Sequence, residues 1–231
     1  MTWWLDESAY AGAEHLDPAY VARYDRKAAF DPAADVAVLR SHGLDRDCTV
    51  VDLGAGTGTF TIAVAPLCHS VVAVDVSPAM TAMLRDRVAA LGIANVRVAD
   101  GGFLSYDHAG EPADFVYTRN ALHHIPDFWK GVALDRVAAW LRPGGILRLR
   151  DLVFDFAPAE AGERIEAWTS GAVHDAAVGW TAPELAEHVR GEFSTYSWLL
   201  EMMLERTGFE IVERAFRRSV YGTYTCRRRA G

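Results

Sequence analysis

The sequence predicts an α/β fold: a mostly parallel, seven-stranded sheet with helices on both faces and an antiparallel strand at its C-terminal end. Apolar strands alternate with helices of about 10–15 residues between residues 48 and 152, which is typical of a parallel sheet with crossover helices. Two further strands, over residues 209–217 and 219–227, follow one another almost without a connection. With 231 residues the chain is long enough for one domain, which we take to span residues 1–231.

Composition and charge narrow the class of protein. The net charge of −8 argues against a surface that binds nucleic acid, because such surfaces are normally basic. Cys48, Cys68 and Cys226 are odd in number and far apart, which favours three reduced thiols. The chain begins without a secretory signal and has no apolar run near the roughly 20 residues that cross a bilayer. We therefore expect a cytoplasmic monomer or homodimer without a membrane partner.

Two helices precede the alternating region, and each begins with an aspartate followed by a proline. Asp17 and Pro18 begin the first helix, and Asp31 and Pro32 begin the second. An aspartate side chain caps the free amides of a first helical turn, and proline fits its first position. Gly43 is a suitable end for the second helix.

The alternating region begins at residue 48. It contains strands at 48–53, 70–75, 95–99, 113–118 and 145–152, with helices at about 58–67, 78–91 and 127–141. Parallel strands require crossover connections, and ligands bind beyond the carboxyl ends of such strands. We therefore expect the functional site where these five strands end.

Three glycines form the turn between the first strand and its helix, in the stretch VVDLGAGTGTF. A backbone without Cβ atoms curves sharply there, and the free amides of the new helix point toward an approaching ligand. The dinucleotide fingerprint requires a glycine where this chain has Thr59. Asp75 ends the next strand 21 residues after Gly54, where a carboxylate meets the hydroxyls of a ribose. The turn thus indicates a nucleotide site but not the usual dinucleotide.

Five stretches, taken in order, resemble the successive motifs of class I S-adenosylmethionine-dependent methyltransferases. They read VVDLGAGTGTF, VVAVDVSPAM, VRVADGGF, ADFVYTRNALHHIPD and VAAWLRPGGILRLRD, and they fall within residues 48–152. The resemblance implies a Rossmann-like domain with the cofactor S-adenosyl-L-methionine and the product S-adenosyl-L-homocysteine.

The same resemblance implies the residues that bind the cofactor. The methionine part would lie along Gly54, Ala55, Gly56 and Gly58; Asp75 would bind the ribose; Val76, Met80, Asp100, Gly101 and Phe103 would surround the adenine; and Asn120 and Ala121 would lie near the sulfonium. There is a simpler interpretation for two of these residues. Considered by itself, Asp75 or Asp100 is more readily explained as a helix cap or as a solvent-exposed strand end. Asp52 either binds loop amides or takes part in the cofactor site, and the sequence leaves both open.

Candidate catalytic residues follow the fourth strand. Methyl transfer is an in-line displacement, so the enzyme must align the acceptor, and a base is needed only for some nucleophiles. His123 and His124 lie where acceptor would meet cofactor, and a histidine with its ordinary pKa of about 6.5 can accept a proton. The plainer interpretation is that one packs under the loop while the other faces solvent. No Asp, Glu or Cys stands beside them at ligand spacing, so we expect no metal site.

Two segments are expected to cover the site. Residues 1–43 form an N-terminal helical lid, in which Tyr20 and Tyr24 share one helix face and would contact substrate. Residues 153–195 are the least regular stretch, which suits an insertion over the substrate site, with Trp168 in its wall.

Two arginines stand out in the strand over 145–152, because a central parallel strand is normally apolar on both faces. Arg148 and Arg150 share one face, and a buried arginine needs a partner. We expect Arg148 to pair with a carboxylate on a covering helix. Arg150 either does the same or contacts substrate.

The function that these features favour is methyl transfer to an O, N or C nucleophile of a small organic molecule. The family's amino-methylating nucleic-acid enzymes resemble one another in an acidic residue or Asn followed by two prolines and an aromatic residue, whereas this chain has TRNALHH. A protein methyltransferase and a non-catalytic S-adenosylmethionine-binding protein remain as alternatives. A dinucleotide oxidoreductase is disfavoured by Thr59.

Overall fold

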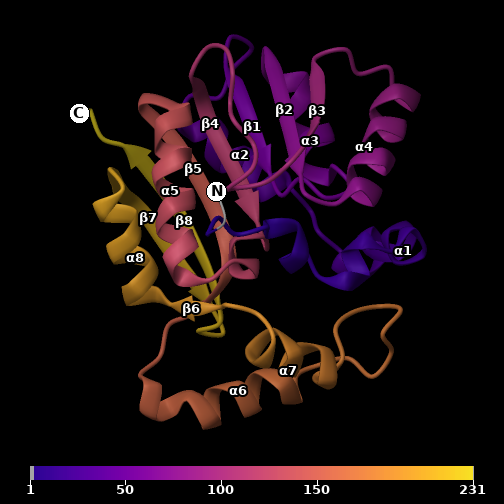
Figure 1. Cartoon of the computed structure of the whole chain (residues 1–231), viewed down its shortest axis with the longest axis vertical. Coiled ribbons are helices and arrows are strands. Elements are labelled where there is room, and N and C mark those ends of the chain that lie inside the picture. Colours follow the sequence, from indigo (N-terminus) through magenta and orange to yellow (C-terminus); the bar gives the residue numbers. More distant parts are fainter. Residues whose placement is uncertain (1–2, 231) are drawn as a thin grey trace.

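The computed structural model describes residues 3–230 and confirms the α/β prediction (Figure 1). The strand order in the sheet is β3-β2-β1-β4-β5-β8-β7. The strands are β1 (Thr49–Leu53), β2 (Ser70–Asp75), β3 (Val96–Asp100), β4 (Ala113–Arg119), β5 (Leu141–Phe154), β7 (Phe209–Arg217) and β8 (Tyr221–Arg228). Strand β8 runs antiparallel to both neighbours, as predicted, and a two-residue strand, β6 (Thr195–Tyr196), adds an eighth member beside β5.

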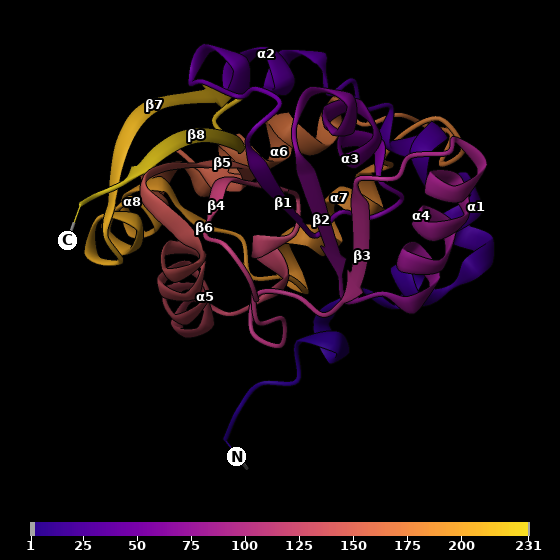
Figure 2. The ribbon, with the colours of Figure 1, turned by 90° about the horizontal axis from the view of Figure 1, so that it is seen from above.

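Helices cover both faces of the sheet, and Figure 2 shows α2 and α5 on opposite sides. The helices are α1 (Pro18–Ala28), α2 (Ala33–Ser41), α3 (Thr59–Val64), α4 (Pro78–Ala90), α5 (Asp127–Trp140), α6 (Ala161–Ser170), α7 (Ala182–Arg190) and α8 (Ser197–Arg206). The predicted cap at Asp17 is confirmed, because its side chain accepts the Ala19 amide at 2.9 Å. The second helix starts one residue later than predicted: α2 begins at Ala33 with Pro32 as its N-cap, although Asp31 accepts the Ala33 amide at 2.9 Å. No helix in the described part of the chain is long and apolar enough to cross a bilayer.

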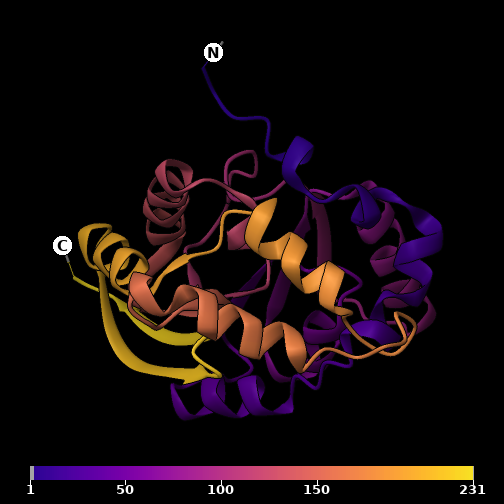
Figure 3. The same cartoon turned by 90° about the horizontal axis from the view of Figure 1, so that it is seen from below.

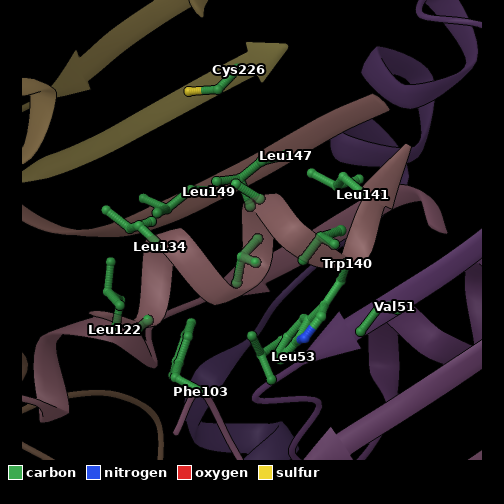
Figure 4. Close-up of a cluster of buried hydrophobic side chains, with 14 of the residues drawn as sticks. Val51, Leu53, Phe103, Leu122, Leu134, Trp140, Leu141, Leu147, Leu149 and Cys226 are labelled. Atoms are coloured by element: carbon green, nitrogen blue, oxygen red, sulfur yellow. The ribbon is translucent and has the colours of Figure 1, made fainter. Parts of the chain in front are cut away.

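The hydrophobic core consists of two layers, because successive residues of a strand point to opposite faces of the sheet. Figure 4 shows the layer around α5, where Val51, Leu53, Leu147 and Leu149 of the strands lie near Leu134 of the helix. The layer on the other face contains Val50, Phe60, Phe115 and Tyr117. The three cysteines are buried and unpaired, as expected.

A buried ion-pair cluster joins α2 to the centre of the sheet. The carboxylate of Asp35 is fully buried and accepts hydrogen bonds from Arg148 Nε (3.0 Å), a terminal nitrogen of Arg150 (2.6 Å) and the Tyr117 hydroxyl (3.1 Å). This confirms the expected partner of Arg148. Arg150 pairs with the same carboxylate, which was the first of the two alternatives for it, and its contact with substrate stays a prediction. Helix α2 therefore packs on the sheet, and the lid role of residues 1–43 stays a prediction.

Two segments far apart in sequence lie beyond the carboxyl ends of the strands. Figures 1 and 3 show α6 and α7 crossing that end of the sheet, with α1 beside them. The stretch over 153–195, predicted to be irregular, thus contains two helices. Helix α7 begins with a capping box in which the Glu184 side chain and the Thr181 amide pair at 2.8 Å.

The Asp35 cluster predicts a large stability effect. Asp35→Ala leaves two guanidinium groups without their carboxylate in a buried place, so we expect the free energy of unfolding to fall by about 3–5 kcal/mol. Urea titration measures the loss. The matched control is Arg40→Ala, which removes an exposed side chain from the same helix. A loss in Asp35→Ala no greater than in the control would contradict this account of the cluster.

Candidate active site

The glycine-rich loop makes two close contacts that only glycine allows. Gly54 has a φ of +75°, and a Cβ on it would lie 2.5 Å from the Cβ of Ala121 in the loop after β4. Gly58 has a φ of +87°, and a Cβ there would lie 2.0 Å from Leu84 of α4. Gly54 therefore lets two loops meet at the site, whereas Gly58 is needed for packing the helices.

A cleft of about 670 Å³ lies at the carboxyl ends of the first four strands. Nine residues predicted for the cofactor line it: Gly54, Gly56, Asp75, Val76, Met80, Gly101, Phe103, Asn120 and Ala121. Asp52 and Ala55 instead line a neighbouring cleft behind the glycine loop. Gly58 and Asp100 line neither cleft.

The three acidic residues of the motifs have different environments. The carboxylate of Asp75 borders the cleft and accepts the amides of Gly56 and Ser77, each at 2.8 Å. Asp52 is buried and accepts the Thr61 hydroxyl at 2.5 Å, and desolvation raises the pKa of its carboxyl to about 7. Asp100 is exposed and is bound by Thr81 and Arg85, so the predicted adenine contact finds no support in its position.

The N-terminal segment completes the cleft. Glu7, Ala11, His15 and Tyr24 line it together with the strand ends. The carboxylate of Glu7 accepts the amides of Leu104 and Ser105 at 2.7–3.1 Å and so joins this segment to the loop after β3. The role of Glu7 could not be predicted from the sequence, because its partners are 97 and 98 residues away.

Two residues that follow each other at the end of β4 also face the cleft. Arg119 lies over the Phe30 ring at 4.0 Å and forms no ion pair with any residue in the part of the chain that the structure describes. Asn120 adopts a left-handed φ of +50°, which is uncommon outside glycine and is typical of functional loops. Its amide donates to the Arg150 carbonyl at 2.9 Å, which fixes the turn.

A second cavity of about 410 Å³ adjoins the cleft, and we call it the acceptor cavity. Its walls are His15, Tyr24, Asn120, His123, His124, Leu152, Trp168, Trp180, Leu185, His188 and Tyr221. Four of these residues, namely His15, Tyr24, Asn120 and His124, also line the cofactor cleft. Trp168 and Tyr24 thus lie where the sequence predicted, whereas Tyr20 and Arg150 line neither space.

The two histidines after β4 differ in environment. His124 faces both cavities, and burial, together with the nearby His123, lowers its pKa to about 3. His123 is buried between Asp151, which binds its Nδ1, and Glu192, whose Oε2 lies 3.2 Å from its Nε2. Burial opposes protonation of His123, but the two carboxylates outweigh it and raise its pKa to about 9. Of the two histidines, only His124 lines both the cofactor cleft and the acceptor cavity, at the place that we call the junction. His123 lines the acceptor cavity alone.

Known proteins resemble this chain in sequence. A family model described as "Methyltransferase domain" matches residues 50–145. A protein of Exiguobacterium sibiricum named as an uncharacterized methyltransferase is 33% identical over 164 residues, covering 70% of this chain and 68% of the relative. The chain belongs to the class I S-adenosylmethionine-dependent methyltransferases. A similarly named protein of Anoxybacillus flavithermus is 27% identical over 172 residues, which is 74% of each chain.

Solved structures share the fold of this methyltransferase. The N-methyltransferase NodS from Bradyrhizobium japonicum, in complex with S-adenosyl-L-homocysteine, has a TM-score of 0.59 at 17% identity, over 85% of this chain and 86% of that one. The [4+2]-cyclase SpnF has a TM-score of 0.65 at 17% identity, over 86% and 81% of the two chains. Such low identity shows the fold alone.

S-adenosylmethionine is the cofactor of this methyltransferase, and the cleft fits it in three respects. Asp75 would offer a carboxylate to ribose hydroxyls, which are hydrogen-bond donors. Val76, Met80 and Phe103 would provide an apolar lining for adenine. Arg119 would provide a cation for the carboxylate of the methionine part.

Cofactor affinity should depend on Asp75. Asp75→Ala removes the acceptor for the ribose hydroxyls, and hydrogen bonds to a charged group contribute about 1.5–3 kcal/mol, so the dissociation constant should rise at least about tenfold. Calorimetry with S-adenosyl-L-homocysteine measures it. The matched control is Asp86→Ala, an exposed carboxylate on α4. An Asp75→Ala affinity equal to that of the control would show that the carboxylate does not bind the ribose.

Proposed function

We propose that this methyltransferase methylates a small organic molecule held in the acceptor cavity. The observation that carries the proposal is the shared wall: four side chains border both the cofactor cleft and the acceptor cavity. A molecule in the second space would therefore lie next to the methyl-bearing end of a cofactor in the first. In-line transfer requires this juxtaposition, in which the acceptor approaches from the side opposite the leaving sulfur.

The walls of the acceptor cavity favour a small aromatic or apolar molecule. Four of its residues are apolar or aromatic: Trp168 of α6, Trp180 just before α7, Leu185 of α7 and Tyr221 of β8. The net charge of −8 gives no support to nucleic acid as the substrate.

The chain's own residues have three tasks in this proposal, while the cofactor supplies an activated methyl group on a positively charged sulfur. Asn120 and Tyr24 position the two reactants at the junction. Helices α6 and α7 exclude water from it. His15 provides a proton acceptor: its Nδ1 donates to the Ala11 carbonyl at 2.8 Å, so the neutral ring carries its lone pair on Nε2. That buried Nε2 has no hydrogen-bond partner among residues 3–230, which leaves it available to an acceptor hydroxyl or amine.

Filling the acceptor cavity tests the proposal. Leu185→Trp should occupy the cavity, so transfer of a labelled methyl group from S-adenosylmethionine to the low-mass fraction of a cell extract should fall at least about tenfold. The affinity for S-adenosyl-L-homocysteine should stay unchanged. The matched control is Val189→Trp, one turn further along α7 and outside the cavity. His15→Ala should slow transfer at saturating S-adenosylmethionine by roughly 10²-fold or more, as expected for loss of a general base.

The fraction that carries the label separates the alternatives. Label in proteins would favour a protein methyltransferase, and label in RNA or DNA would favour a nucleic-acid enzyme. Cofactor binding without label in any fraction would favour a non-catalytic binding protein. Each of these results would overturn the small-molecule proposal.

A further inference from the structure

A cluster of four ionisable side chains lies beside the acceptor cavity: His123, His188, Glu192 and Asp151. Glu192 Oε2 is 3.2 Å from His123 Nε2 and 2.5 Å from His188 Nδ1. One nitrogen from each histidine and one oxygen of Glu192 all lie within 4.8 Å of one another. All four side chains are largely buried, with exposed fractions of 16% or less. The cofactor site uses none of these converging atoms.

Asp151 orients His123 from the other side. Its carboxylate is bound by His123 Nδ1 and also accepts the Leu122 amide at 2.8 Å. Because a carboxylate only accepts, Nδ1 must carry the proton, and the lone pair of a neutral His123 lies on Nε2 and faces Glu192. A carboxylate behind a histidine is the arrangement that typically supports a metal-bound imidazole.

The three converging groups are held in place by the fold. His188 and Glu192 are four residues apart at the end of α7. The Phe193 amide donates to the His123 carbonyl at 2.9 Å, which joins this segment to the loop after β4. Ligand atoms about 2.1 Å from a tetrahedral zinc ion lie roughly 3.4 Å apart, close to the 3.2 Å between His123 and Glu192. The 2.5 Å between His188 Nδ1 and Glu192 Oε2 is shorter than this, so His188 would have to move away from Glu192 by about 1 Å to complete such a geometry.

The charge of the cluster also favours a cation. With both imidazoles neutral, two carboxylates place a charge of about −2 in a site with little solvent, and buried charge requires compensation. A divalent metal ion would supply it.

We propose that His123, His188 and Glu192 bind one divalent transition-metal ion, with Asp151 as a positioning residue. Two imidazoles and a carboxylate suit zinc, iron(II) or cobalt(II). Three protein ligands leave a coordination position open, and both histidines line the acceptor cavity. A further step rests on the proposed function: the open position would bind an oxygen of the methyl acceptor, such as a phenol, enol or carboxylate.

Metal titration tests the site without cofactor or acceptor. The full chain, treated with EDTA and dialysed, is titrated with Co²⁺ by visible absorption and with Zn²⁺ by calorimetry. We expect one ion per chain, and His188→Ala and Glu192→Gln should each weaken binding at least about tenfold. The matched control is His174→Ala, an exposed histidine in the same segment, which should bind like the wild type. Zinc should raise the melting temperature of the wild type but not of the two ligand variants.

Each outcome decides the proposal. Absence of bound Co²⁺ and Zn²⁺ in the wild type would mean that the cluster is an ion pair only. Equal binding by wild type and a folded Glu192→Gln variant would place the metal elsewhere, and circular dichroism establishes that the variant is folded. A protein that binds metal but labels no small molecule would refute the proposed function alone, whereas methylation of a small molecule without any bound metal would refute only the metal site.

Discussion

The buried carboxylate of Asp151, at the carboxyl end of β5, fixes the loop on which both cavities depend. It accepts the amides of Leu122 and His123 at 2.8 and 3.3 Å and also binds the His123 ring. The same loop carries Asn120 and His124 to the junction between the cofactor cleft and the acceptor cavity. The side chain of Asp151 thereby sets the position of residues that face two different ligand spaces. Because its carboxylate is buried, breaking its hydrogen bonds would leave a charged group without partners, which is costly in free energy.

The two ligand spaces are built from different parts of the chain. Strand ends and the turns after them supply most of the cofactor cleft, where register within the sheet fixes their positions. The acceptor cavity depends on segments that only cover the sheet. Lys27 of α1 connects these covers, because its ammonium lies 2.5 Å from Glu184 of α7 and 4.4 Å from the centre of the Trp180 ring. In the proposed function, the strand ends would hold the cofactor and the covering segments would enclose the acceptor.

The sequence predicted what local patterns determine. Strand alternation, the Asp17 cap and the glycine turn each depend on neighbouring residues, and all appear in the structure. It could not predict contacts across the fold: Glu7 with Ser105, Asp35 with Arg150, or Glu192 with His123 join residues that lie far apart in the chain. For the same reason, spacing along the chain could not show that Glu192 lies beside both His123 and His188. Asp100 matches the position of a family motif, but in the structure its carboxylate forms an ion pair with Arg85.

We propose that Asn120 and its loop lie between the bound cofactor and a small acceptor. A crystal structure of the full chain with S-adenosyl-L-homocysteine would show whether they do. We expect the thioether sulfur to lie in van der Waals contact with Asn120, within about 4 Å, and to face the acceptor cavity. A sulfur atom that faces bulk solvent, or is separated from the acceptor cavity by protein atoms, would contradict it.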